Sequence, residues 1–292
     1  MDRNEFLDKV MRIMEERLGE GYEVKREETL KNNGVRESGI LVRKGKIGTI
    51  FYLDGFLKKG GLQEGDLQAC ADQLLRTYLE TSREGSAYRG MGEGIQSWES
   101  IRGNVYPALL PLEDNRELLK NLVWKPFLDL AAICIVQFPE TEAGIANAKI
   151  SVQLMGLWGI SEENLWGQAM ENLQREYDCR WMHEVIQECV PGIDVEKPEN
   201  EFRILTNKAK RYGAAGILEQ DILRRQSQGK NLYILPSSIH ESLLLEDNGM
   251  FEQEELDGMV KSINEEQVPE GERLSDHCYY YDYAKDEVRT QK

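Results

Sequence analysis

The segment YILPSSIHESLLL, residues 233–245, places serines and one of only three histidines between two apolar runs. Ser238 and His240 would share a face of an extended chain, with Cα atoms about 6–7 Å apart. A serine beside a histidine is the pairing of a nucleophile with its base, so the chemistry would be hydrolysis. No G-x-S-x-G elbow accompanies the pair. A hairpin corner explains the segment equally, because Pro236 and Ser237 favour a turn.

A second candidate site is an anion-binding loop in TNKAKRYGAAG, residues 206–216. Lys208, Lys210 and Arg211 precede Gly213 where a helix is predicted to start, so positive side chains would lie beside free N–H groups. The structural alternative is that the small residues 213–216 let the helix pack closely on a sheet. Both interpretations remain open.

The sequence predicts no metal ion and no cofactor. Cys179 and His183 are four residues apart on a predicted helix, but Cys189 would face away from them. No HExxH or EF-hand pattern is present, and the glycine-rich RGMGEG segment lacks the GK[ST] ending of a phosphate loop. The five cysteines include no CxxC pair, which favours a reducing compartment.

The net charge of −16 is unevenly distributed. Residues 1–60 hold 13 Lys/Arg against 11 Asp/Glu, whereas residues 247–292 hold 5 against 13. An acidic chain repels phosphates, so we expect no direct nucleic-acid binding and no membrane binding. The charge is explained either by solubility or by an acidic surface that docks on a protein partner of basic character or imitates nucleic acid.

Membrane insertion is not expected either. The longest apolar run, LAAICIV, is far shorter than the roughly 20 residues that a membrane helix needs. The first 18 residues carry charges throughout and no apolar core of a signal peptide. We therefore expect a cytoplasmic protein.

The element pattern predicts an α+β fold with three lobes. Residues 1–82 read as helix, three strands and helix, with the first helix over 3–18 and Asn and Gly in the hairpin turns. A glycine-rich loop, 83–97, leads to a mainly helical middle region, 98–190, with one buried strand in FLDLAAICIVQF and helices after Ser161 and over 179–190.

The third lobe follows a linker at 191–200. Residues 201–292 read as strand, helix, strand, strand, helix, strand, which is the order of a ferredoxin-like (βαββαβ) lobe. This lobe would place both helices on one face of an antiparallel sheet. The tyrosines of CYYYDY would form either a partner-docking edge strand or part of the sheet's core.

Several segments occur in an order that resembles a known family. They are KNNGV, FYLDGF, MGLWGISEENL, LTNKAKRYGAAGIL, LYILPSSIHESLLL and LSDHCYYYD, and YGAA…IL with YILPSSIHE is the most specific part. The chain resembles the bacterial family labelled domain of unknown function 5688 over nearly its whole length. The resemblance implies an intact bacterial, cytosolic fold and places Ser237, Ser238, His240 and Glu241 within the family pattern. It implies no activity.

No complete catalytic, metal or phosphate constellation accompanies the acidic, tyrosine-rich C-terminal segment. The sequence therefore favours a non-enzymatic binding or regulatory protein with an acidic interaction surface. One alternative is a hydrolase that uses Ser238 and His240. The other is an acidic mimic of nucleic acid that acts on a nucleic-acid-binding protein.

Overall fold

The computed structural model describes residues 2–45, 47–52, 65–83, 91–92, 94–140, 146–190, 192, 195–198, 200–236 and 238–291. The chain divides into two compact units. Unit 1 comprises Met1–Lys31, Val35–Ser97 and Glu140–Gly144, and unit 2 comprises Asn32–Gly34, Trp98–Pro139 and Ile145–Lys292. Apart from residues 140–144, the predicted lobes 98–190 and 201–292 both fall within unit 2. Much of the predicted loop 83–97 lies outside the described residues.

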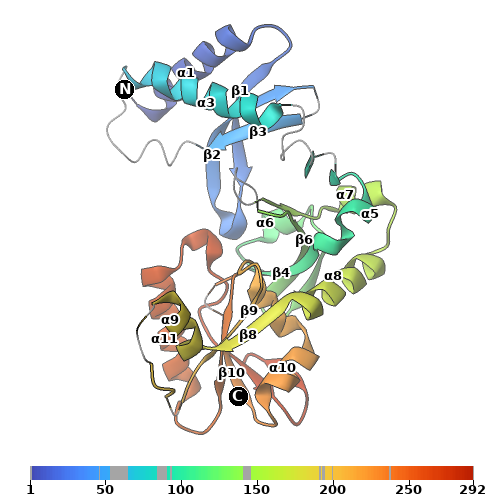
Figure 1. The fold of residues 1–292 in the computed structure, drawn as a ribbon, viewed down its shortest axis with the longest axis vertical. Coiled ribbons are helices and arrows are strands. Elements are labelled where there is room, and N and C mark those ends of the chain that lie inside the picture. The colour runs from blue at the N-terminus through green and yellow to red at the C-terminus, as the bar shows by residue number, and fades with distance from the viewer. Residues whose placement is uncertain are drawn as a thin grey trace. The chain divides into compact units, whose positions relative to one another are not determined.

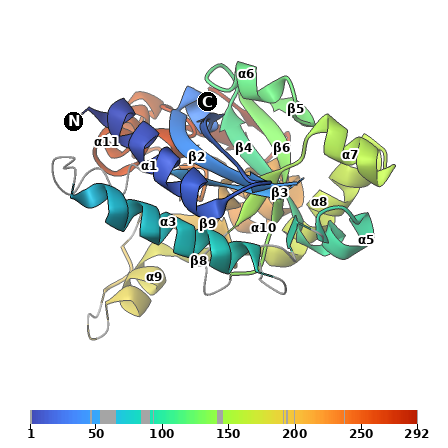
Figure 2. The ribbon, with the colours of Figure 1, turned by 90° about the horizontal axis from the view of Figure 1, so that it is seen from above.

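Unit 1 is a three-stranded antiparallel sheet with two helices. The elements are α1 (Arg3–Leu18), β1 (Glu23–Leu30), β2 (Arg36–Lys44), β3 (Ile47–Tyr52) and α3 (Asp66–Ser82). Asp2 caps α1 by accepting a hydrogen bond of 2.8 Å from the Glu5 N–H. Apolar side chains of both helices pack with those of β1 and β2 in one core. Figure 2 shows α1 and α3 side by side.

The first sheet of unit 2 is built around β6 (Leu130–Gln137), whose residues are all buried. Its neighbours are β4 (Val105–Pro111), β5 (Trp124–Phe127) and β7 (Asn147–Lys149). The helices of this region are α5 (Trp98–Ile101), η2 (Arg102–Asn104), α6 (Arg116–Leu119), α7 (Val152–Trp158) and α8 (Glu162–Glu176). The buried strand is confirmed, and Ser161 caps α8 as predicted. The expectation of a single strand is wrong, since β4, β5 and β7 are strands as well. The sequence did not predict these three strands because they are short or contain proline and show little apolar–polar alternation.

The second sheet of unit 2 has six antiparallel strands in the order β13-β12-β10-β11-β9-β8. These strands are β8 (Tyr177–Trp181), β9 (Arg203–Asn207), β10 (Leu232–Leu235), β11 (Ser242–Glu246), β12 (Tyr279–Asp282) and β13 (Glu287–Arg289). Between them lie α9 (Met182–Cys189), η3 (Gly213–Leu218), α10 (Gln220–Ser227), α11 (Gln253–Gln267) and η4 (Glu270–Glu272), and η1 (Asn32–Gly34) belongs to the same unit.

The helices α10 and α11 cover opposite faces of this sheet (Figure 1). Ile234 of β10 packs in the same cluster as Leu223 of α10, whereas the adjacent Tyr233 packs in the cluster that holds Leu256 of α11. The connection from β9 through α10 to β10 and the connection from β11 through α11 to β12 run in the same direction across the sheet. The parallel strands β9 and β10 are, however, antiparallel to the parallel strands β11 and β12. Right-handed connections then place the two helices on opposite faces. The α+β class is confirmed, and the ferredoxin-like arrangement is wrong.

Two other local expectations are corrected. The helix predicted over 179–190 begins only at Met182, because residues 177–181 form the edge strand β8 that pairs with β9. The tyrosines Tyr279, Tyr280 and Tyr281 are buried, and β12 lies between β10 and β13. These tyrosines are part of the core, and β12 is not an edge strand of the sheet. None of the described helices is both long enough and apolar enough to cross a membrane.

Candidate functional site

A pocket of about 430 Å³ lies in unit 2 where its two sheets meet the segment before β12. Its walls are formed by residues 111–114 at the end of β4, Asp129 at the turn from β5 to β6, and Glu270 with residues 273–277 before β12. Asn33 of η1 also lines it. Side chains from four separate parts of the chain therefore converge on one cavity.

A pair of asparagines fixes the walls of this pocket. Asn33 adopts a left-handed conformation (φ 57°), and its Nδ2 donates to the carbonyl oxygens of Glu270 (2.7 Å) and Arg273 (2.8 Å). Its N–H donates to Asn115 Oδ1, and Asn115 Nδ2 donates back to Asn33 Oδ1, each at 2.9 Å. These bonds hold the β4 end and the segment before β12 at a fixed separation.

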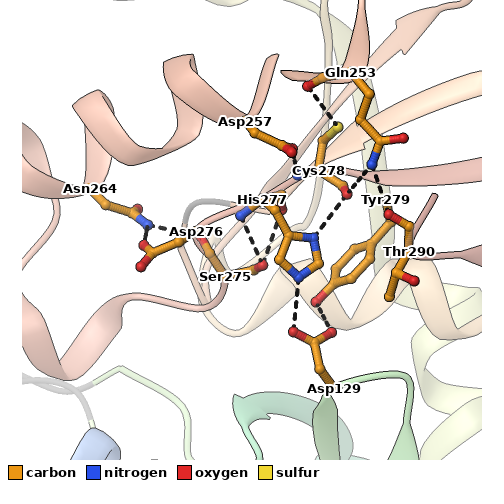
Figure 3. A network of polar contacts seen from close by, with 10 residues as sticks. All are labelled: Asp129, Gln253, Asp257, Asn264, Ser275, Asp276, His277, Cys278, Tyr279 and Thr290. Atoms are coloured by element: carbon orange, nitrogen blue, oxygen red, sulfur yellow. Dashed lines mark hydrogen bonds and ion pairs between the residues drawn. The ribbon is translucent and has the colours of Figure 1, made fainter. Parts of the chain in front are cut away.

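Asp129, His277 and Tyr279 form a charged network at the pocket (Figure 3). His277 Nε2 lies 3.0 Å from Asp129 Oδ2, and Nδ1 lies 3.0 Å from the Cys278 carbonyl oxygen. The Tyr279 hydroxyl donates to Asp129 Oδ1 at 2.7 Å. A carbonyl oxygen can only accept, so Nδ1 carries a proton, and a carboxylate as the other partner favours a proton on Nε2 as well.

The pKa shifts agree with an imidazolium beside a carboxylate. The hydrogen bond to Asp129 raises the pKa of His277 to about 9, against the opposing effect of partial burial. Burial tends to raise the pKa of Asp129, but the hydrogen bonds from His277 and Tyr279 outweigh it and hold this pKa below its ordinary value. Burial raises the pKa of the Tyr279 hydroxyl. At neutral pH the pair is therefore ionised.

Helix α11 holds the segment that carries His277 (Figure 3). Asn264 Nδ2 donates to the Ser275 carbonyl oxygen (2.8 Å) and to Asp276 Oδ1 (2.7 Å). The Cys278 N–H donates to Asp257 Oδ1 at 2.7 Å. Because the backbone on both sides of His277 is anchored, the imidazole is held in place before any ligand arrives.

The pocket carries an excess of negative charge. The carboxylates of Asp114 and Glu270 have no hydrogen-bond or ion-pair partner among the described residues, whereas Glu113 is held by the Arg116 guanidinium at 2.7 Å. Asp129 and His277 neutralise each other, and Arg273 is the remaining cation of the lining. This balance favours a ligand that carries positive charge.

Ser238 and His240 lie at the corner between β10 and β11, which pairs with the segment before β12: the Ile239 N–H donates to the Glu272 carbonyl oxygen at 2.8 Å, and Ser238 forms a β-bridge with Arg273. The Ser238 hydroxyl accepts a hydrogen bond of 3.0 Å from the His240 backbone N–H. The imidazole instead accepts the Tyr212 N–H at Nδ1 (3.3 Å) and approaches Glu272 through Nε2 (3.7 Å). The structure thus brings the two residues together through the backbone and gives no hydrogen bond from the hydroxyl to the imidazole. Ser237 lies outside the described residues.

Two residues of the predicted anion loop, Lys208 and Gly213, have partners within the chain. The Lys208 ammonium lies 3.2 Å from Glu176 Oε2, and the Gly213 N–H donates to the His240 carbonyl oxygen at 3.0 Å. Lys210 is exposed, and the Arg211 N–H donates to Asn207 Oδ1. The helix predicted from residue 213 begins as the six-residue 3₁₀ helix η3. Gly213 packs against β9 so closely that a Cβ atom would lie 2.6 Å from the Asn207 nitrogen.

No group of three or more His, Cys, Asp or Glu side chains in the described part of the chain could hold a metal ion. Cys179 lies on β8 and His183 on α9, so the shared helix face predicted for them is wrong. Burial raises the pKa of the Cys179 thiol to about 11, which makes it a poor nucleophile at neutral pH.

A comparison with family models decides the relationship that the sequence segments indicated. Residues 3–283 match the model described as a family of unknown function, DUF5688. The chain belongs to this DUF5688 family. No curated protein and no solved structure matches it.

In this DUF5688 chain the network of Asp129, His277 and Tyr279, of which Asp129 and His277 line the pocket, was not predicted from the sequence. His277, which precedes β12, and Tyr279, its first residue, are two residues apart, and their rings lie 4.9 Å apart in an edge-to-face contact. Their spacing was therefore visible in HCYYYD. The pairing of Asp129 with His277 could not be seen in the sequence, because 148 residues separate the two.

Proposed function

We propose that this DUF5688 protein is a non-enzymatic binding protein whose acidic pocket accepts basic side chains of a protein partner. The observation that carries the proposal is the pair Asp114 and Glu270, whose carboxylates line the pocket without a partner among the described residues. A lysine or arginine side chain would supply the N–H donors and the positive charge that complement them.

The protonation state of the pocket supports binding rather than proton transfer. A general base needs a free lone pair within reach of the substrate. Both nitrogens of His277 are occupied, and Asp129 accepts two hydrogen bonds. Ser275 Oγ donates to the His277 carbonyl oxygen at 3.0 Å and accepts the His277 N–H at 3.2 Å. These groups stabilise the walls and leave the unpaired carboxylates to contact a ligand.

The test is fluorescence anisotropy with a labelled peptide of alternating Lys, Arg and Gly, beside a Glu/Gly peptide of the same length. The variant Asp114→Asn with Glu270→Gln should weaken binding of the basic peptide about tenfold, since charges at an interface rim contribute about 0.5–1 kcal/mol each. The matched control, Glu163→Gln with Glu265→Gln, removes two exposed carboxylates outside the pocket and should change affinity less than about twofold.

Two results would contradict the proposal. One is equal loss of affinity in the pocket variant and the control, which would indicate a response to net charge alone. The other is a purified hydrolase activity that both Ser238→Ala and His240→Ala abolish, which would favour the hydrolase alternative. If the basic partner proves to be a nucleic-acid-binding protein whose nucleic acid competes for the same site, the mimicry alternative applies.

A further inference from the structure

The strand β8 forms one edge of the six-stranded sheet in unit 2. It pairs with β9 on one side and has no strand on the other side among the described residues. Figure 1 shows β8 as the strand that joins α8 to α9. All five of its residues stay partly exposed, whereas every residue of the interior strand β10 is buried. An open edge of this kind is a template for the addition of another strand.

The pairing with β9 determines which backbone groups of β8 point to the open edge. At one end of the pair the Lys208 N–H donates to the Glu176 carbonyl oxygen at 2.9 Å, and at the other end the Met182 N–H donates to the Phe202 carbonyl oxygen at 3.0 Å. The partners on the β8 side are both even-numbered, and such bonds recur at every second residue of a regular antiparallel pair. The odd-numbered residues of β8 therefore direct their N–H and carbonyl groups away from β9.

Cys179 lies at the centre of this edge. Its outward N–H and carbonyl oxygen have no hydrogen-bond partner among the described residues. The Tyr177 N–H donates to the Leu173 carbonyl oxygen at the end of α8, and the Trp181 N–H donates to Glu184 Oε2 at 3.3 Å. The edge therefore presents a free donor and a free acceptor at the same residue, which is the requirement for pairing with an identical strand.

The sequence of β8, YDCRW, is complementary to itself when two copies run antiparallel about Cys179. Asp178 of each copy then lies opposite Arg180 of the other, and Tyr177 lies opposite Trp181. Opposite charges and aromatic rings that face each other directly across two antiparallel strands stabilise the pairing. The side chains of Asp178 and Arg180 are 32% and 28% exposed, and their ion pair of 3.2 Å within the strand places both on the same face.

We propose that two copies of this chain associate through β8, with the two strands antiparallel about a two-fold axis at Cys179. The Cys179 N–H of each copy donates to the Cys179 carbonyl oxygen of the other, and the Trp181 N–H exchanges Glu184 for the Tyr177 carbonyl oxygen of the second copy. The two sheets become one continuous sheet in which β8 is no longer an edge. The opposite edge strand, β13, has only three residues and no aromatic pair.

The first test is sedimentation velocity of the intact chain over a wide range of concentrations, because self-association depends on concentration. The net charge of −16 makes two copies repel each other at long range, so the buffer contains 0.15 M KCl, where the Debye length is about 8 Å. The mass should rise from 33.6 kDa towards twice that value. In hydrogen exchange, the Cys179 amide should become more protected as the concentration rises. A mass that stays at 33.6 kDa, or no change in protection, would overturn the proposal.

A charge exchange identifies the strand that pairs. Asp178→Arg and Arg180→Asp each place like charges opposite one another twice in the dimer, so each variant alone should dimerise at least tenfold more weakly. An equimolar mixture of the two variants restores opposite charges at both positions and should associate again, to within about threefold of the unchanged chain. Mixing cannot reverse a loss of folding, so this recovery separates pairing from a structural defect.

The matched control lies on the opposite edge of the sheet. Glu287→Arg in β13 is exposed and makes the same change in net charge as Asp178→Arg, and it should leave the dimer within twofold of the unchanged chain. Equal weakening by Glu287→Arg, or a mixture of the two β8 variants that associates no better than either alone, would overturn the proposal. The acidic pocket contains no residue of β8, so the basic-peptide assay is independent of this result.

Discussion

At the scale of single residues, the Asp129–His277 pair links protonation to the stability of unit 2. The pKa of His277 is raised from 6.5 to about 9, so its stabilising effect is fully present below pH 6.5 and is lost as the pH rises through about 9. The pKa of Asp129 is lowered, so its effect is present above its ordinary value and is lost as the pH falls. The pair therefore contributes most at neutral pH.

A double-mutant cycle with Asp129→Asn and His277→Gln should isolate this effect. We expect a coupling free energy of about 1 kcal/mol at pH 7, because both side chains are partly exposed and solvent screens them. The coupling should fall towards zero at pH 10, measured by urea unfolding at each pH. Other groups that titrate between pH 7 and 10 cancel in the cycle. An equal coupling at both values, or an NMR titration of His277 near its ordinary pKa, would contradict the assignment.

The same residues show how much of the site could be predicted from the sequence. The pattern drew attention to Ser238 and His240 because they are close along the chain, and they do lie at one corner. The charged network instead joins Asp129 to His277, and no local pattern links residues so far apart. Local spacing predicts which side chains share a face, whereas the packing of two sheets decides which faces meet.

At the scale of elements, the close approach of η3 to β9 depends on one glycine. A Cβ atom at Gly213 would lie 2.6 Å from both the Asn207 nitrogen and the Thr206 Cα, and backbone atoms cannot easily move aside. Gly213→Ala should therefore lower the free energy of unfolding by about 1–3 kcal/mol. Gly167 of α8 has no atom within 4 Å of the same position, so Gly167→Ala should raise it by about 0.5–1 kcal/mol. Urea unfolding of both variants checks the pair, and equal effects would contradict the packing explanation.

Elements with strong local patterns were predictable, and those formed by tertiary pairing were not. The helix over 3–18 has a capping aspartate and an apolar stripe, and it is observed with those bounds as α1. The strand β8 carries Tyr177, Cys179 and Trp181 in a sequence that also fits a helix. Pairing with β9 decides its conformation, because tertiary contacts outweigh weak local propensity.

At the scale of the whole molecule, the order of strands was the least predictable feature. The sequence predicts the succession of strands and helices in residues 201–292, but succession alone allows the last strand to lie beside the first or the second. The structure places β12 beside β10, and α10 and α11 then cover opposite faces. Successive side chains of β10 point to opposite faces of the sheet, and all of them are apolar and buried. Each face of the sheet at β10 therefore needs a helix to cover it, and this arrangement supplies one on each.

The net charge of −16 is also a property of the whole molecule, and it makes a prediction about association rates. If the partner is basic, the summed field should accelerate encounter, and salt should screen it because the Debye length shrinks from about 30 Å at 0.01 M to about 3 Å at 1 M. The association rate of the basic peptide should fall at least about tenfold between 20 and 500 mM KCl, while dissociation changes less than about threefold. Stopped-flow fluorescence measures both rates. An association rate that does not depend on salt would show that the distributed charge does not guide the partner, and any affinity would then come from contacts within the pocket alone.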